Sequence, residues 1–206
     1  MNKRIVTSYE EPDLDGVSSM YAYSEYLNKI GISSDYYIKG NPKKEVEIVC
    51  DLFGIDLLGC EEILEEQEAV LLDTNNLEEA PFLEPEQIVE IIDHHSKNKS
   101  SDECKNAKIH IERLGAVATL ITEKFKKNNI PLSRESAILL YYGIISNSIN
   151  LKASITNEKD INITLDVNGI SDITECKIIK NGVVWEDYEF KNILPAESVI
   201  YIKFDL

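Results

Sequence analysis

The sequence has 206 residues, of which 43% are hydrophobic and 28% charged, and its formal net charge is −16. This composition predicts a folded chain with enough residues for one or two domains. An acidic surface repels a phosphate backbone, and arginine occurs only at Arg4, Arg113 and Arg134. The composition therefore argues against general nucleic-acid binding.

The lengths of the apolar runs and the spacing of the cysteines indicate in which cellular compartment the protein is expected. Polar and charged residues from Thr7 onward leave no signal-peptide core, and no apolar run approaches the roughly 18 residues of a membrane span. The four cysteines are widely spaced without a Cys-x-x-Cys motif, which disfavours a disulfide framework and a structural zinc site. We expect a cytoplasmic protein with no membrane segment.

Strand and helix patterns alternate over the first three quarters of the chain. Short apolar, β-branched runs predict strands, and apolar residues three and four apart predict helices. The predicted strands cover 4–8, 35–39, 69–72, 88–92 and 107–112, and the predicted helices cover 17–31, 42–53, 117–125 and 131–146, with Ser133 as an N-cap. This rhythm predicts an α/β domain with a mainly parallel sheet and helices on both faces.

The pattern changes after Lys152. Apolar residues alternate with polar ones at Ile161, Ile163, Leu165 and Val167, the period of a half-buried antiparallel strand. Asn181-Gly182 lies between the β-rich runs 176–180 and 183–190 and predicts a hairpin, and 198–205 predicts a further strand. We expect an α/β domain at 1–155 and a small β-rich extension at 156–206.

Six polar side chains follow three of the predicted strands. They are Asp13 and Asp15 after the first strand, Asp73 after the third, and Asp93, His94 and His95 after the fourth. Each alone fits a turn, a helix cap or a polar loop. Together, at the shared carboxyl edge of a parallel sheet, they would repel one another unless cations neutralised them. The set predicts a divalent-metal site.

Three strings in this set resemble a known family. Pro12-Asp13-Leu14-Asp15, Leu72-Asp73-Thr74-Asn75 and Ile92-Asp93-His94-His95 resemble the first three motifs of the DHH phosphoesterases. Segments 114–119, 143–148 and Leu151-Lys152 look like the corresponding region of manganese-dependent (family II) inorganic pyrophosphatases. The resemblance covers residues 4 to about 160 and implies a DHH phosphoesterase-like fold.

The resemblance implies a site of one or two manganese ions, with magnesium or cobalt as alternatives, that activates water against phosphorus. In that arrangement Asp13 binds the first ion, Asp15 and His94 bind the second, and Asp73 bridges both as a catalytic residue. Asn147 is the remaining ligand position. The resemblance also implies that Asp93 orients a histidine and that His95 contacts the substrate phosphate as a second catalytic residue.

The chain departs from the family pattern in three respects. Tyr9 stands where the family has a histidine, and Asn147 stands where it has an aspartate. No arginine follows Arg134, although the second domain of the pyrophosphatases supplies cations to the substrate. Lys152 and Arg113 are the remaining candidates for substrate binding, and each also fits a solvated surface charge. We expect a weakened first metal position.

Two functions from different classes follow. The first is a divalent-metal-dependent hydrolase of the DHH class that cleaves a phosphoanhydride or phosphodiester, such as pyrophosphate or a small nucleotide. The second is a degenerate, non-catalytic DHH protein that binds metal or a phosphorylated ligand, or serves as a regulatory subunit. The expected partner is a small phosphorylated substrate, and the resemblance also suggests a homodimer.

Overall fold

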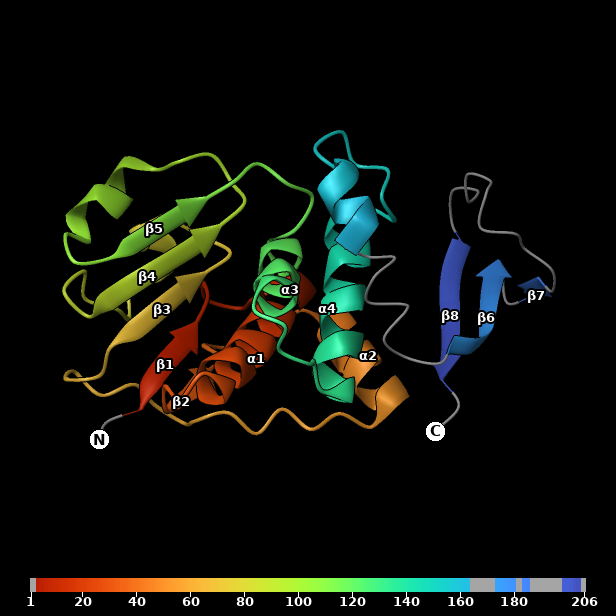
Figure 1. Cartoon of the computed structure of the whole chain (residues 1–206), viewed down its shortest axis with the longest axis horizontal. Coiled ribbons are helices and arrows are strands. Elements are labelled where there is room, and N and C mark those ends of the chain that lie inside the picture. Colours follow the sequence, from red (N-terminus) through yellow and green to blue (C-terminus); the bar gives the residue numbers. More distant parts are fainter. Residues whose placement is uncertain (1–2, 164–172, 181–182, 186–197, 205–206) are drawn as a thin grey trace. The chain divides into compact units, whose positions relative to one another are not determined.

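The computed structural model describes residues 3–163, 173–180, 183–185 and 198–204 (Figure 1). The chain forms two compact units, Met1–Leu165 and Asp166–Leu206, and each is described by itself. The domain boundary expected between 155 and 156 stays a prediction.

The first unit is built on a five-stranded parallel sheet with the order β2-β1-β3-β4-β5. Its strands are β1 (Arg4–Thr7), β2 (Ser34–Tyr37), β3 (Ala69–Leu72), β4 (Ile88–Asp93) and β5 (Lys108–Ile111). The predicted parallel α/β fold is confirmed. All five carboxyl ends meet at one edge, which is where loops converge in open α/β sheets.

The predicted helices are present in the same order. They are α1 (Leu14–Lys29), α2 (Lys44–Phe53), α3 (Val117–Lys127) and α4 (Arg134–Asn147), and the 3₁₀ helices η1 (Leu77–Glu79) and η2 (Lys99–Glu103) add to them. Ser133 caps α4, as predicted, because its side chain accepts a hydrogen bond from Ser136 N at 3.1 Å. The left-handed backbone of Gly54 (φ 63°) ends α2.

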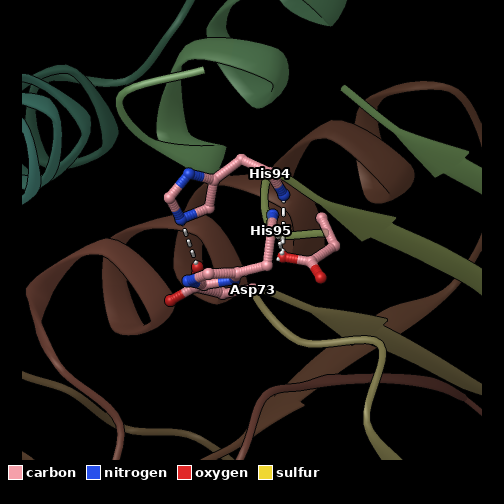
Figure 2. Close-up of side chains that lie close together, drawn as sticks. Asp73, His94 and His95 are labelled. Atoms are coloured by element: carbon pink, nitrogen blue, oxygen red, sulfur yellow. Dashed lines mark hydrogen bonds and ion pairs between the residues drawn. The ribbon is translucent and has the colours of Figure 1, made fainter. Parts of the chain in front are cut away.

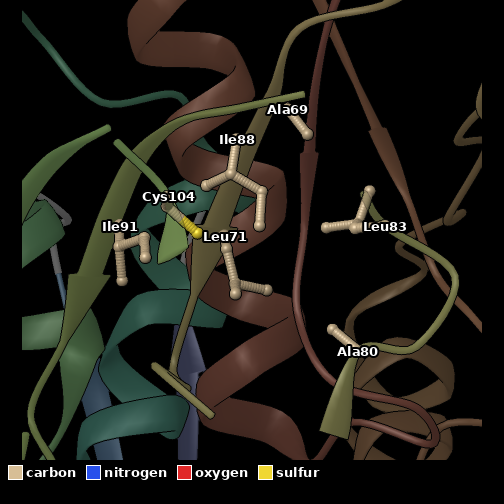
Figure 3. Close-up of a cluster of buried hydrophobic side chains, with 7 residues drawn as sticks. All are labelled: Ala69, Leu71, Ala80, Leu83, Ile88, Ile91 and Cys104. Carbon is tan, nitrogen blue, oxygen red and sulfur yellow. The ribbon is translucent and has the colours of Figure 1, made fainter. Parts of the chain in front are cut away.

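Helices cover one face of the sheet, and loops that carry short 3₁₀ helices cover the other. On one face α1 and α3 pack against the strands, and α4 packs against α1 (Figure 1). On the other face a cluster of buried apolar side chains joins β3 and β4 to the loops that carry η1 and η2 (Figure 3). Its members are Ala69, Leu71, Ala80, Leu83, Ile88, Ile91 and Cys104. The central strands are therefore buried on both faces, which explains their continuous apolar runs.

The strand expected to contain Ile161 and Ile163 was a wrong prediction, because residues 158–163 are helical. Asn157 Oδ1 accepts from Lys159 N at 2.8 Å and from Asp160 N at 3.4 Å, and Asp160 Oδ2 accepts from Asn157 N at 3.0 Å. This reciprocal pair is a capping box that starts a helix. Leu165 and Val167 lie outside the described residues.

The second unit contains a three-stranded antiparallel sheet with the order β7-β6-β8. Its strands are β6 (Ile173–Lys180), β7 (Val183–Trp185) and β8 (Ser198–Phe204). Lys180 pairs with Val183, so the two strands flank the dipeptide 181–182 of the predicted hairpin, which lies outside the described residues. Within the described ranges, no helix is both long and apolar enough to cross a membrane.

Glu25 joins α1 to the beginning of α4. Its carboxylate accepts hydrogen bonds from Ser133 N at 2.9 Å, from Ser133 Oγ at 2.6 Å and from Ser136 Oγ, and it pairs with Lys29 at 2.6 Å. Burial would raise the pKa of Glu25, but these partners outweigh burial and hold it below its ordinary value of 4.5.

We predict that Glu25→Gln lowers the free energy of unfolding at pH 7 by about 1–3 kcal/mol. A lowered folded-state pKa contributes stability that is present above pH 4.5 and is lost as the pH falls through the folded value. The difference between wild type and variant should therefore shrink in acid. Urea unfolding at pH 7 and in steps below pH 4.5 measures it, with exposed Glu66→Gln as control. A difference that does not vary with pH would contradict this assignment.

Candidate metal centre

Four side chains from two strand ends form a compact group, which we call the Asp–His cluster. Asp73, Asp93, His94 and His95 each place one ligand atom within 4.8 Å of the others (Figure 2). The first three are buried and His95 is exposed. Their positions follow from the sheet, since β3 ends one residue before Asp73 and β4 ends at Asp93.

Asp73 lies in a strained turn directly after β3. Its φ is +62°, in the left-handed region that aspartate tolerates better than most residues. The side chain is 2% exposed, and within the described structure no hydrogen-bond donor reaches its Oδ1 atom. Burial, followed by the nearby charges of Asp15 and Asp13, raises the pKa of Asp73 well above its ordinary value.

The ring of His94 faces this unsatisfied oxygen. Its Nδ1 lies 2.9 Å from the carbonyl oxygen of Leu114, and since a carbonyl only accepts, Nδ1 carries the hydrogen. In the neutral ring Nε2 is then an acceptor, 3.2 Å from Asp73 Oδ1 and 3.7 Å from Asp15 Oδ2. Acceptors this close repel one another unless a proton or a cation lies between them. The donor set therefore fits a metal ion.

Asp93 and His95 form the second half of the Asp–His cluster. Asp93 is fully buried, and its Oδ1 lies 2.9 Å from His95 Nδ1 and accepts from His94 N at 2.7 Å. Burial would raise the pKa of Asp93, but hydrogen bonds from His95 and Asn75 outweigh burial and lower it. The same hydrogen bond raises the pKa of His95, whose side chain is 57% exposed. This places an oriented imidazole with a raised pKa at the surface.

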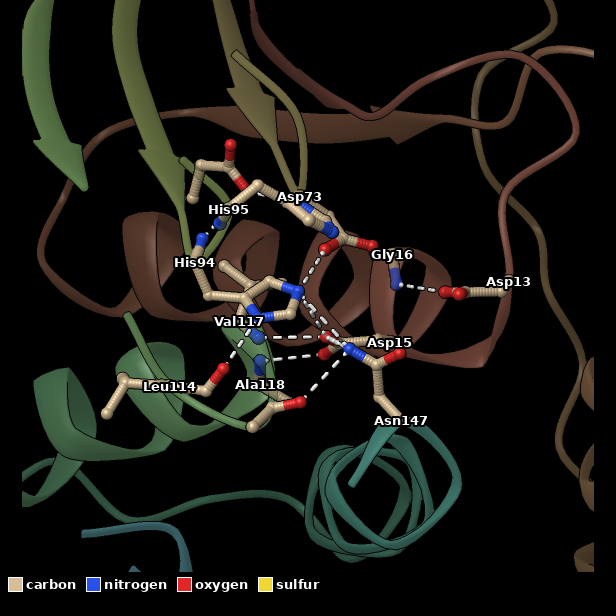
Figure 4. A network of polar contacts seen from close by, with 12 residues as sticks. Asp13, Asp15, Gly16, Asp73, His94, His95, Leu114, Val117, Ala118 and Asn147 are labelled. Atoms are coloured by element: carbon tan, nitrogen blue, oxygen red, sulfur yellow. Dashed lines mark hydrogen bonds and ion pairs between the residues drawn. The ribbon is translucent and has the colours of Figure 1, made fainter. Parts of the chain in front are cut away.

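Asp15 lies beside the Asp–His cluster in the first turn of α1 and is 1% exposed. Its carboxylate accepts from Val117 N and Ala118 N, both at 2.8 Å, at the start of α3, and from Asn147 Nδ2 at 2.8 Å (Figure 4). Burial is the largest influence and raises the pKa of Asp15 to about 7, against the opposing effect of His94. Both of its oxygens are thus already hydrogen-bonded.

Asp13 and Tyr9 lie in the loop between β1 and α1. Asp13 caps α1, because its side chain accepts from Gly16 N at 3.1 Å. The Tyr9 hydroxyl oxygen accepts from Asp13 N at 3.0 Å. Burial, followed by the charges of Asp73 and Asp13, raises the pKa of Tyr9. Tyr9 is therefore a neutral phenol beside the acidic residues.

Asn147, the last residue of α4, contributes a donor to the site. Its Nδ2 donates to Asp15 Oδ2 and lies 3.2 Å from both His94 Nε2 and the carbonyl oxygen of Gly115. An amide nitrogen bears hydrogens and does not bind a cation, so in this orientation Asn147 satisfies the acceptors by hydrogen bonding.

The two basic residues that were candidates for substrate binding, Arg113 and Lys152, lie outside the Asp–His cluster. Arg113 is exposed and donates from Nη1 to the Oγ atom of Ser96, the residue that follows His95. Lys152 is exposed and lies five residues after Asn147. Arg113 thus reaches the loop after β4, whereas Lys152 belongs to the turn after α4.

Sequence reasoning missed two residues that support the site. Asn75 donates to Asp93 Oδ2 and to the carbonyl oxygen of Ser96, which ties the ends of β3 and β4 together. Asp160 is fully buried and accepts from Gly115 N at 2.8 Å. The capping sequence Asn157-Glu158-Lys159-Asp160 was the available signal for the helix that carries Asp160.

Residues 3–144 match the model of the DHH family, N-terminal domain. A "Probable manganese-dependent inorganic pyrophosphatase" of Lactiplantibacillus plantarum is 30% identical over 96% of this chain and 66% of that protein. A protein of the same description from Streptococcus thermophilus is 24% identical over 78% of this chain and 53% of its own length. The chain thus spans about half to two thirds of these relatives.

Solved structures share the fold. A "putative family II inorganic pyrophosphatase" of Methanococcus jannaschii superposes with a TM-score of 0.70 at 23% identity, over 84% of this chain and 57% of that chain. An exopolyphosphatase-related protein from Bacteroides fragilis gives 0.61 at 15% identity, over 82% of this chain and 52% of that one.

We predict that Asn147→Asp destabilises the metal-free protein by about 1–3 kcal/mol, because a carboxylate replaces a donor that faces three acceptors. The same change should strengthen Mn²⁺ binding about tenfold, alone or with Tyr9→His, because it adds a charged ligand. Thermal unfolding with and without Mn²⁺, together with calorimetric titration, measures both effects. Asn150→Asp changes the charge equally outside the Asp–His cluster. Unchanged Mn²⁺ affinity in both site variants would refute this placement of the site.

Proposed function

The chain belongs to the DHH family, and from that premise we propose that it is a divalent-metal-dependent phosphohydrolase acting on a phosphoanhydride or phosphodiester of a small molecule. The observation that carries the proposal is the pair of facing acceptors, Asp73 Oδ1 and His94 Nε2, 3.2 Å apart. Burying both is costly unless a proton or a cation lies between them, and a cation would also neutralise the carboxylate of Asp15 beside them. The curated relatives are described as manganese-dependent pyrophosphatases, which favours manganese and pyrophosphate as the first pair to test.

Asp73 and His94 are the residues that would hold the ion, with Asp15 beside them. Oxygen and imidazole donors suit manganese, and magnesium or cobalt are alternatives. Such an ion supplies Lewis acidity toward a phosphoryl oxygen and offsets negative charge that develops on it. The hydrogen bond from His94 Nδ1 to Leu114 keeps Nε2 free as a donor of electrons to the metal.

His95 is the group we assign to the substrate. Asp93 anchors its Nδ1 atom and raises its pKa, so the imidazolium persists to higher pH than that of a free histidine. The exposed ring can then donate a hydrogen bond from Nε2 to an anionic phosphoryl oxygen, or a proton to the leaving group. Arg113, which donates to the neighbouring Ser96, is the nearest candidate for a second phosphate contact.

Asn147 favours a second candidate function, a non-catalytic DHH protein that binds metal or a phosphorylated ligand or serves as a regulatory subunit. Its amide donates to Asp15 and approaches His94, so part of the buried negative charge is compensated without a cation. Together with Tyr9, this leaves fewer charged ligands than the family pattern implies. The domain division, which follows from the change of sequence pattern after Lys152, and the homodimer, which follows from the resemblance, remain proposals.

The decisive experiment is phosphate release from pyrophosphate, short polyphosphate and a nucleotide panel, with and without Mn²⁺. We expect Mn²⁺-dependent release by the wild type, and release at background level for Asp73→Ala and Asp73→Asn. Asparagine tolerates the positive φ of this position, so Asp73→Asn separates loss of the ligand from backbone strain. Exposed Asp102→Asn serves as the control with the same chemical change.

Each outcome distinguishes the candidates. Turnover that is lost only in the Asp73 variants supports the hydrolase and ranks its substrates. Mn²⁺ binding without turnover on any substrate selects the non-catalytic alternative. A wild type that binds no Mn²⁺ in calorimetry contradicts the metal site itself.

A further inference from the structure

One short segment contacts three residues of the site. Residues 114–119, which we call the bridging segment, lead from β5 into α3. The carbonyl oxygen of Leu114 accepts from His94 Nδ1 at 2.9 Å, and that of Gly115 lies 3.2 Å from Asn147 Nδ2. Val117 N and Ala118 N donate to both oxygens of Asp15 (Figure 4). A small displacement of the bridging segment would therefore move all three contacts together.

The bridging segment does not cap its own helix. The N-cap position of α3 is Ala116, which has no side-chain acceptor for the first N–H groups of the helix. The carboxylate of Asp15, from α1, takes that role, and the carboxylate of Asp160 binds the residues on either side of it. Asp15 accepts from the first two helical N–H groups, and Asp160 accepts from Gly115 N at 2.8 Å and Thr119 Oγ1 at 2.6 Å. The positive end of α3 favours both negative charges.

Asp160 is fully buried and lies in close contact with Gly115. It is 0% exposed, and it also accepts a hydrogen bond from Asn157 N at 3.0 Å. A Cβ atom on Gly115 would lie 3.0 Å from Asp160 Oδ2 and 3.2 Å from the Cβ of Ser148. A side chain at position 115 would have to displace these neighbours by a few tenths of an ångström, so glycine favours the close approach of Asp160 and Gly115, which are 45 residues apart in sequence.

We propose that Asp160 is a positioning residue of the metal site. By fixing Gly115 and Thr119, it holds the bridging segment where Leu114 orients His94 and where Val117 and Ala118 orient Asp15. Asp160 itself lies outside the 3–144 stretch that matches the family model. The inference rests on the proposed function in one respect, since its main readout is metal binding.

The test uses the full chain and Mn²⁺ alone, titrated by calorimetry. Asp160→Asn keeps the size of the side chain but replaces one acceptor by a donor facing Gly115 N or Thr119 Oγ1. We expect the Mn²⁺ affinity to fall about 10- to 100-fold, the usual effect of losing a residue that orients ligands. Glu25→Gln, which removes a carboxylate from the start of α4 instead, should leave the affinity within about twofold of wild type. Wild-type affinity in Asp160→Asn would overturn the proposal.

Thr119 supplies a milder pair of variants in case Asp160→Asn does not fold, as judged by circular dichroism. Thr119→Val removes the hydroxyl that donates to Asp160, whereas Thr119→Ser keeps it. If Asp160 positions the bridging segment through Thr119, Thr119→Val should weaken Mn²⁺ binding several-fold, whereas Thr119→Ser should bind Mn²⁺ with the affinity of the wild type. Equal affinities in the two variants would count against the proposal.

Amide hydrogen exchange in the metal-free protein separates this inference from the proposed function. The N–H groups of Val117 and Ala118 should exchange at least about tenfold faster in Asp160→Asn than in Glu25→Gln at matched global stability. If the wild type binds no Mn²⁺, the proposed function fails, yet faster exchange at these two amides still supports the role of Asp160. Unchanged exchange there would refute it whatever the metal does.

Discussion

Three buried carboxylates close to one another are the constraint on which the rest of this site depends. Each must be compensated, because an isolated buried charge is very costly. Asp93 is compensated by His95 and by backbone N–H groups, and Asp15 by the first turn of α3 and an amide. Asp73 Oδ1 lies 3.2 Å from the ring nitrogen of His94 and has no hydrogen-bond partner among the described residues. Hydrogen-bond donors around the site thus compensate Asp93 and Asp15, whereas one oxygen of Asp73 has no donor among the described residues.

The sequence predicted the parts of this arrangement that depend on short-range pattern. The apolar runs of β3 and β4 end at Asp73 and Asp93, so the position of these acids at the sheet edge could be foreseen. The alternation of Ile161 and Ile163 was misleading, because the capping box of Asn157 and Asp160 decides the local structure instead. Period alone cannot distinguish a two-residue repeat from one helical turn over so few residues.

Other features could not be predicted because they join distant parts of the chain. Nothing near Asp160 in the sequence indicates that it will meet Gly115 and Thr119. The direction of the Asn147 amide likewise depends on residues far from it in sequence, because its nitrogen faces acceptors of Asp15, His94 and Gly115. The sequence alone shows that Tyr9 and Asn147 replace a histidine and an aspartate of the family pattern. How these two residues affect the buried charges depends on their contacts, which only the structure shows.

The turn after α4 has a consequence for how this chain can vary. Ile149, Asn150 and Leu151 all have positive φ, a conformation that costs roughly 1–2 kcal/mol for each ordinary residue. The turn reverses the chain so that Ser148 and Asp160, twelve positions apart by their numbers, both lie beside Gly115, where an added Cβ would meet each of them within 3.2 Å. Surface loops usually tolerate insertions and deletions. Here a change in length between 149 and 156 would carry Asp160 away from Gly115, so this loop is held to a fixed number of residues.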